Sequence, residues 1–472
     1  MNNFVRSSKK LGILSIALLT IVSIDSVRNL PTMALFGSTL IFFFLLGALF
    51  FLIPSALVSA ELSSSQAEHG GVYVWVKNAF GAQMGVLAVW LQWVENVIWY
   101  PTILSFVAGT LGYLISPDLA TKSYFLVTVI LIAFWIATIV NLLGIKSSAW
   151  FSNFCAIFGL ILPMSLIILL GADWLVLGKP LQIDFSWHGI LPHHGETGVW
   201  VALAGIMLSF CGMEIATVHG QDVKNPSKDY PRALLLAVTV IFFTLLCGSL
   251  AIAMVIPQNH ISLVAGIMQA FEVFFKLHHL NWILPFMAII LVIGGMGSVS
   301  NWIIAPVRGL QIAARDGNLP KNFDQLNRFN APFVLLIYQA LIVTFVSLVF
   351  LLMPSVNASY WLLTALAAQL YMIMYVLMFM SCIYLRYSRA EVSGIGFKIP
   401  FGLKGVVVVA SAGILGALTT FIIGFIPPAN IDVGGVWHYE SLLIIGLLVM
   451  ASPAFILFQL MKSQSSLSLL NP

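Results

Sequence analysis

Long apolar runs separated by short polar stretches make up most of the chain. Runs of roughly 20 residues are long enough to cross a bilayer as a helix, and we count twelve of them. They lie near residues 11–36, 38–60, 84–115, 123–143, 148–171, 197–221, 232–256, 281–310, 332–353, 359–386, 404–426 and 438–461. The pattern therefore predicts an all-α membrane protein with twelve transmembrane helices.

Two of these runs are interrupted by polar residues. The first is broken by residues 23–31, and the sixth is broken after Phe210, within a stretch (208–233) that carries glycines, Glu214 and His219. Backbone that leaves the helical pattern at membrane depth is tolerated only where protein or a water-filled cavity satisfies its amides and carbonyls. We therefore expect a polar site inside the membrane.

The two interruptions fall in the first segments of two consecutive groups of five. Paired interruptions at matching places in repeated halves are the best sequence indication of a transporter site. Each broken helix exposes amide N–H groups at the start of its second half and carbonyl groups at the end of its first half. A carboxylate suits the former and an ammonium group the latter, so a zwitterionic amino acid fits both.

Composition and charge agree with a membrane protein and predict its orientation. Hydrophobic residues make up 60% of the 472 residues and charged residues only 8%, with a mean hydropathy of +1.02. Of the 21 Lys and Arg residues, Arg28 lies within the first segment, and all others except Lys122, Lys179 and Lys276 fall on the side of the termini. The positive-inside rule therefore predicts that both termini are cytoplasmic.

Several motifs carry a family resemblance over nearly the whole chain. Residues 212–214 with 225–233 resemble the sixth-helix signature of the amino acid, polyamine and organocation transporter superfamily, and residues 306–309 with 313–320 resemble its segment after helix eight. Within the superfamily, the chain is most similar to the bacterial glutamate/γ-aminobutyrate antiporters in residues 253–257, 265–269, 397–400 and 425–431.

The resemblance implies a domain organisation. It implies a five-plus-five inverted-repeat core with broken helices 1 and 6, followed by two C-terminal helices. The expected parts are a cytoplasmic tail (1–10), a first repeat (11–171), an extracytoplasmic loop (172–196), a second repeat (197–386), helices 11 and 12 (387–461) and a short cytoplasmic tail (462–472). The pattern leaves open whether the chain acts as a monomer or a homodimer.

The first-helix site departs from the family pattern. The Gly-Ser-Gly sequence whose amides hold a substrate carboxylate in the arginine/agmatine exchanger falls on Ile24, Asp25 and Ser26 here. A carboxylate beside Asp25 would be repelled unless Arg28 offsets the charge. Two alternatives follow. Asp25 and Arg28 form a structural ion pair, as intramembrane charges often do, or one of them contacts substrate.

Other candidates come from the remaining segments. Asn96 matches a substrate-facing asparagine of the family, and Glu95 is an intramembrane acid, which marks a functional candidate. Glu214 corresponds to a glutamate that connects helix six to helix one, and His219 aligns with a histidine of the glutamate antiporters, so both are candidates for pH sensing. The predicted substrate site comprises Ser23, Ile24, Asp25, Ser26, Arg28, Glu95, Asn96, Trp99, Phe210, Cys211, Gly212, Glu214, Trp302 and Tyr371.

No catalytic constellation, phosphate-binding loop or metal-ligand spacing competes with this interpretation, so we expect neither an enzyme nor a cofactor. The favoured function is amino acid antiport by alternating access in the bacterial inner membrane, with a substrate, a counter-substrate and lipid as partners and no nucleic acid. An ion-coupled symporter, with Ser298 and Ser300 as sodium-ligand candidates, and a non-transporting amino acid sensor are the alternatives. Because the sequence ends at Pro472, shortly after the last segment, we expect no C-terminal plug of the kind that closes the glutamate antiporters.

Overall fold

The computed structural model describes residues 12–65, 71–144, 154–192, 197–216, 226–388 and 397–470. Every regular element within these ranges is a helix. The prediction of an all-α membrane protein is therefore confirmed.

The described residues contain 10 helices long and apolar enough to cross a membrane, and up to 11 spans if the one bent pair is counted as a single span. The bent pair joins Ile13–Ile24 to Val27–Ala34 at an angle of 41°. The ten spans formed by a single helical stretch are Gly37–Ser64, Ala82–Ile115, Ser123–Leu142, Phe154–Val176, Pro231–Val255, Asn281–Ser300, Phe333–Leu352, Val356–Ser388, Gly402–Ile423 and Val436–Ser463.

The sequence predicted twelve spans, and the run at 197–221 accounts for the difference. It is divided into three short helices, α11 (Thr197–Trp200), α12 (Ala202–Ser209) and α13 (Met213–Ala216). Residues 217–221 of the same run lie outside the described residues. None of the three described pieces of this run is long enough to cross a bilayer by itself.

The helices before α11 have the following bounds: α1 (Ile13–Ile24), η1 (Val27–Asn29), α2 (Leu30–Ala34), η2 (Gly37–Thr39), α3 (Leu40–Gly47), η3 (Ala48–Leu52), α4 (Ile53–Ser65), α5 (Gly71–Phe80), α6 (Ala82–Ile115), η4 (Pro117–Thr121), α7 (Ser123–Leu142), η5 (Ile157–Ile161), α9 (Leu162–Val176) and α10 (Trp187–Ile190). Two of these, η3 and η5, are π-helical turns, so the spans that contain them are not uniformly α-helical.

The helices after α13 have the following bounds: α14 (Pro226–Val255), η7 (Gln258–His260), α15 (Gly266–Leu277), η8 (Asn281–Ile283), α16 (Leu284–Trp302), α17 (Ala305–Arg315), η9 (Lys321–Asp324), α18 (Phe333–Ser347), α19 (Val349–Leu352), α20 (Val356–Ser388), α21 (Gly402–Ile423) and α22 (Val436–Leu470). Helix α5 has 10 residues and is too short to cross a bilayer.

Each break has a local cause in the sequence. Asp25 and Ser26 both adopt extended backbone angles, which end α1, and Pro31 lies in the first turn of α2, where its missing N–H costs nothing. Helix α12 ends at Ser209 with Phe210 as its C-cap, and Gly212 follows with φ +111°. Only glycine reaches such a backbone conformation without strain.

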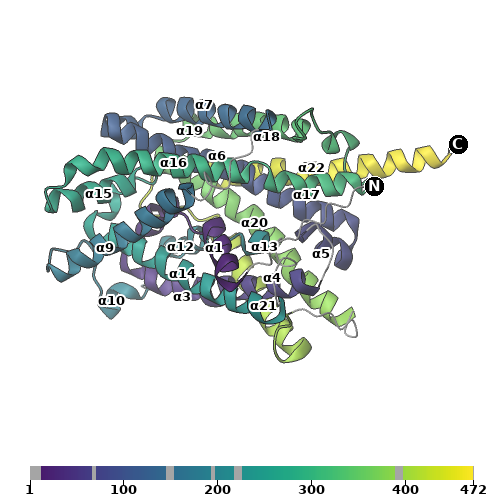
Figure 1. The fold of residues 1–472 in the computed structure, drawn as a ribbon, viewed down its shortest axis with the longest axis horizontal. Coiled ribbons are helices and arrows are strands. Elements are labelled where there is room, and N and C mark those ends of the chain that lie inside the picture. Colours follow the sequence, from purple (N-terminus) through teal and green to yellow (C-terminus); the bar gives the residue numbers. More distant parts are fainter. Residues whose placement is uncertain are drawn as a thin grey trace.

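The broken helices lie in the middle of the bundle (Figure 1). Helix α1 packs on α14 and α13, and α12 packs on α20. The central helices α6 and α20 are the most enclosed of the spans. In their most apolar 18-residue stretches, 72% and 83% of the residues are buried, compared with 11% in the span of α22. Helices α5 and α17 and the end of α22 lie at one end of the bundle, and α10 and α15 lie at the other (Figure 1).

Candidate functional site

A cavity opens at the break of the first helix, which we call the central cavity. Its wall is formed by residues of α1 and η1, the middle of α6, the end of α12, the end of α16 and one residue of α20. Most of the predicted substrate-site residues line it: Ser23, Ile24, Asp25, Ser26, Arg28, Glu95, Asn96, Trp99, Cys211, Gly212, Trp302 and Tyr371.

Four further residues line the central cavity. Ser298 was predicted only as a sodium-ligand candidate, and Val22, Asn29 and Leu208 were not predicted as site residues. Asn29 is the one that the sequence signals, because it is a polar residue inside the first apolar run and directly follows Arg28. The sequence does not distinguish Val22 and Leu208 as cavity-lining residues, because an apolar residue in an apolar run is as typical of a lipid-facing position as of a cavity wall.

The predicted residues Phe210 and Glu214 lie behind the cavity lining. Phe210 is fully buried and packs edge-on against Phe44, with ring centroids 5.5 Å apart. Glu214 is buried and accepts hydrogen bonds from the hydroxyls of Tyr371 and Tyr375 on α20 and from Nε2 of Gln92 on α6. These partners link helix six to α6 and α20. The link from Glu214 to helix one that the family resemblance implies stays a prediction.

The breaks of the two helices approach each other closely. A Cβ placed on Gly212 would lie 3.2 Å from Cγ1 of Ile24, and the N–H of Gly212 donates to the hydroxyl of Tyr375 at 2.8 Å. The sharp turn after α12 therefore needs a residue without a side chain for two reasons, its positive φ and its contact with the first helix.

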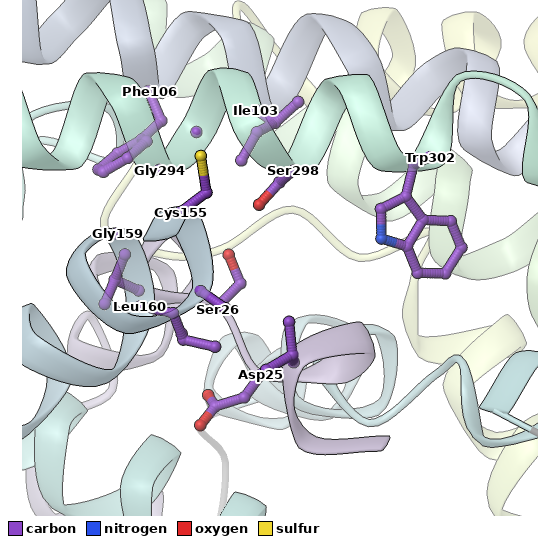
Figure 2. A pocket seen from close by; sticks show the side chains of 14 residues that line it. Asp25, Ser26, Ile103, Phe106, Cys155, Gly159, Leu160, Gly294, Ser298 and Trp302 are labelled. Atoms are coloured by element: carbon purple, nitrogen blue, oxygen red, sulfur yellow. The ribbon is translucent and has the colours of Figure 1, made fainter. Parts of the chain in front are cut away.

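Asp25 and Arg28 have different partners. Oδ2 of Asp25 accepts a hydrogen bond of 2.7 Å from Thr244 of α14, and its carboxylate points away from Ser298 and Trp302 (Figure 2). Among the ion pairs within 4.0 Å in the described part of the chain, none joins Asp25 to Arg28. The two charges that the sequence suggested as a pair are therefore not in direct contact.

Arg28 is held by neutral groups. Its Nη1 donates to Oγ1 of Thr102 at 2.6 Å and to the hydroxyl of Tyr360 at 3.3 Å. These residues belong to α6 and α20, so the cation is positioned by helices distant in sequence from its own.

Glu95 and Asn96 are two neighbouring polar residues in the middle of α6, and their side chains are hydrogen-bonded to each other. Nδ2 of Asn96 donates to Oε2 of Glu95 at 3.1 Å and to the carbonyl oxygen of Gln92 at 3.0 Å. Trp99 lies one turn further along α6, and its ring centroid is 6.1 Å from that of Trp302. The hydroxyl of Tyr100 donates to the carbonyl oxygen of Trp302 at 3.0 Å, which fixes the end of α16 against α6.

A second cavity adjoins the first, which we call the side cavity. It lies between the helix-one break, α6, α16 and the span that contains η5, and the hydroxyls of Ser26 and Ser298 both face it (Figure 2). Ser298 lines both cavities, whereas Ser300 is part of neither lining. The described residues contain no group of three or more His, Cys, Asp or Glu arranged to hold a metal ion. His219 lies outside the described residues.

These features define a helical membrane protein with a polar cavity at a broken helix, an arrangement typical of secondary transporters. Residues 11–449 match the amino acid permease family, and the chain belongs to this family. The family consists of transporters, so the prediction that the chain is not an enzyme is confirmed.

Three relatives illustrate the range of the similarity. An uncharacterized transporter of Legionella pneumophila is 40% identical over 94% of this chain and 95% of its own length. A glutamate/γ-aminobutyrate antiporter of Lactococcus lactis is 29% identical over 96% of this chain and 91% of its own. A putrescine transporter of Haemophilus influenzae is 25% identical over 78% of this chain and 83% of its own.

Proposed function

We propose that the protein is a secondary active amino acid antiporter that works by alternating access, with an exchange similar to that of glutamate for γ-aminobutyrate. The proposal rests on the central cavity, where a buried cation, Arg28, and a buried acid, Glu95, line the same cavity. An amino acid offers one group for each. The similarity to the glutamate/γ-aminobutyrate antiporter of Lactococcus lactis over 96% of the chain supports the same substrate class.

Counterflow in liposomes tests the proposal. Purified protein is reconstituted into vesicles loaded with unlabelled L-glutamate or γ-aminobutyrate, and uptake of labelled L-glutamate is measured from outside. We expect uptake to require the internal amino acid. Equal uptake into empty vesicles under an ion gradient would contradict antiport.

A second candidate, sodium-coupled symport, is supported by one observation. The hydroxyls of Ser26 and Ser298 face the side cavity next to the first-helix break (Figure 2), and hydroxyl oxygens are suitable ligands for a hard cation. Replacing sodium with choline in the counterflow assay separates the two functions, because symport would stop while exchange would continue. A sensor that binds without transport would show no counterflow at all.

We further propose the five-plus-five inverted repeat, with both termini on the cytoplasmic side of a bacterial inner membrane. The bacterial origin of the relatives supports the location, and the distribution of Lys and Arg supports the orientation. Single cysteines at exposed Ser186 and exposed Lys321 test it in a cysteine-free background. A membrane-impermeant maleimide added to intact cells should label Ser186→Cys and not Lys321→Cys; the reverse pattern would invert the topology.

A further inference from the structure

Arg28 is a buried cation in the wall of the central cavity. Its side chain is 3% exposed, and it lies in η1, directly after the break of the first helix. The ring centroids of Trp99 and Tyr360 are 5.7 Å and 6.0 Å from its guanidinium carbon. Aromatic faces stabilise a cation, so the surroundings position the charge without neutralising it.

The hydrogen bonds of Arg28 also leave its charge uncompensated. The acceptors of its Nη1, Thr102 and Tyr360, are both neutral hydroxyls. Its Nε is buried and has no hydrogen-bond partner among the described residues. A buried charge without a paired acid is costly, and a guanidinium binds a carboxylate through two parallel N–H donors. An unpaired guanidinium in a cavity wall therefore indicates a site for an anionic group of the ligand.

Neither of the nearby acids, Asp25 and Glu95, forms an ion pair with Arg28 within 4.0 Å in the described part of the chain. Asp25 is turned toward Thr244 of α14. Glu95 is 5% exposed and lines the same cavity. The cavity wall therefore contains a cation and a carboxyl group that are not in contact, and a ligand with one carboxylate and one ammonium group can bridge them.

We infer that Arg28 binds a carboxylate of the substrate and makes the site select amino acids over polyamines. The inference rests on the proposed amino acid exchange and adds the residue that selects substrates by their negatively charged group. A diamine such as putrescine would lose the contact with Arg28 and would place an ammonium group near a like charge. The chemical class expected in the site is a zwitterion or an acidic amino acid, including amino acids whose two charged groups lie at opposite ends.

Variants at Arg28 test the assignment in the counterflow assay. Arg28→Gln removes the charge and Arg28→Lys keeps the charge without the forked donors. Arg308→Gln makes the same chemical change at an exposed arginine and serves as the matched control. For labelled L-glutamate we expect Arg28→Gln to raise the half-saturation concentration by about tenfold or more, Arg28→Lys to give a smaller rise, and Arg308→Gln to give none.

A binding measurement needs no transport, and its first comparison uses the wild-type protein alone. Thermal stabilisation of the purified wild-type protein is compared for γ-aminobutyrate, 1-butylamine, which lacks the carboxylate, and putrescine. We expect stabilisation by γ-aminobutyrate alone at equal concentration, and we expect the difference between γ-aminobutyrate and 1-butylamine to vanish in Arg28→Gln. If Arg28→Gln does not fold, the wild-type comparison still decides, because equal stabilisation by putrescine would contradict the inference.

The outcomes separate the inference from the proposed function. A folded Arg28→Gln protein that exchanges glutamate with the wild-type half-saturation concentration and discrimination contradicts the role of Arg28 alone. Stabilisation by γ-aminobutyrate that Arg28→Gln abolishes, in a protein that shows no counterflow, supports the role of Arg28 and contradicts exchange.

Discussion

Gly212, at the break of helix six, lies against Ile24, at the break of helix one, with only 3.2 Å between Cγ1 of Ile24 and the position a Cβ of residue 212 would take. Gly212→Ala would add this contact to the strain of φ +111°. We expect it to lower the free energy of unfolding by about 1–3 kcal/mol, the usual cost of such backbone strain, and to abolish exchange. Thermal unfolding in detergent and counterflow measure the two effects.

Gly435→Ala is the matched control for this substitution. Gly435 has φ +108°, almost the same backbone conformation, but a Cβ there would meet no atom within 4 Å. It should show a similar loss of stability and retain exchange. If both variants retain exchange, the contact between the two breaks has no role in transport.

Tyr375→Phe should destabilise the protein more than Tyr371→Phe. Both hydroxyls donate to Glu214, but the Tyr375 hydroxyl also accepts the N–H of Gly212. Its removal leaves that buried N–H without its acceptor, which costs about 1–3 kcal/mol. Both variants are unfolded thermally, alone and combined with Glu214→Gln, in double-mutant cycles. The cycles separate the contribution of the hydrogen bond from the Gly212 N–H from that of the hydrogen bonds to Glu214. Equal destabilisation would show that another group, such as water, replaces the acceptor.

Gly159→Ala should separate two helices. A Cβ on Gly159 would lie 2.1 Å from Cα of Gly294 on α16, and backbone at that distance must move. We expect a loss of about 1–3 kcal/mol in unfolding free energy, typical of overpacking. Gly205→Ala, whose Cβ would meet Thr32 at an ordinary 3.4 Å, should cause no such loss. Equal unfolding temperatures for the two variants would contradict the close packing.

The contact between α5 and the end of α17 predicts a pH dependence at low pH. The Lys77 ammonium group donates to Asp316 and holds the pKa of that carboxyl below its ordinary value; partial burial opposes this effect, and the hydroxyl of Tyr73 adds to it. Because the pKa of Asp316 is lower in the folded protein than in the unfolded chain, the contact stabilises the folded protein at pH values above the ordinary carboxyl pKa of about 4. The stabilisation is lost as the pH falls through the lowered pKa.

Lys77→Gln tests this dependence. Both side chains are about one-third exposed, so the difference in stability from wild type should be below about 1 kcal/mol. It should be constant from pH 7 to pH 5 and shrink below about pH 4. Lys321→Gln changes an exposed lysine and should leave the pH profile of thermal unfolding unchanged. A Lys77→Gln profile parallel to wild type down to pH 3 would contradict the role of this pair.

The sequence by itself determined the helical class, most of the spans and both breaks, because these are local properties. The length of an apolar run decides whether it crosses a bilayer, and the polar residues Asp25 and Ser26 and the glycine at 212 mark the breaks in the sequence itself. The same reasoning found Arg28 and Glu95, since a charge inside an apolar run stands out in the sequence. The sequence also placed the division of the sixth run after Phe210, because Gly212 and Glu214 stand out in an apolar stretch.

Only the tertiary structure decided which groups the buried charges contact. Asp25 and Arg28 are three positions apart, and their spacing suggested an ion pair. In the fold, Asp25 faces Thr244 of α14 and Arg28 faces Thr102 and Tyr360 of α6 and α20. The contact of Gly159 with Gly294 was likewise not readable from the sequence. Such contacts depend on which distant helices pack together and on the direction of each side chain, and no local pattern of residues determines either.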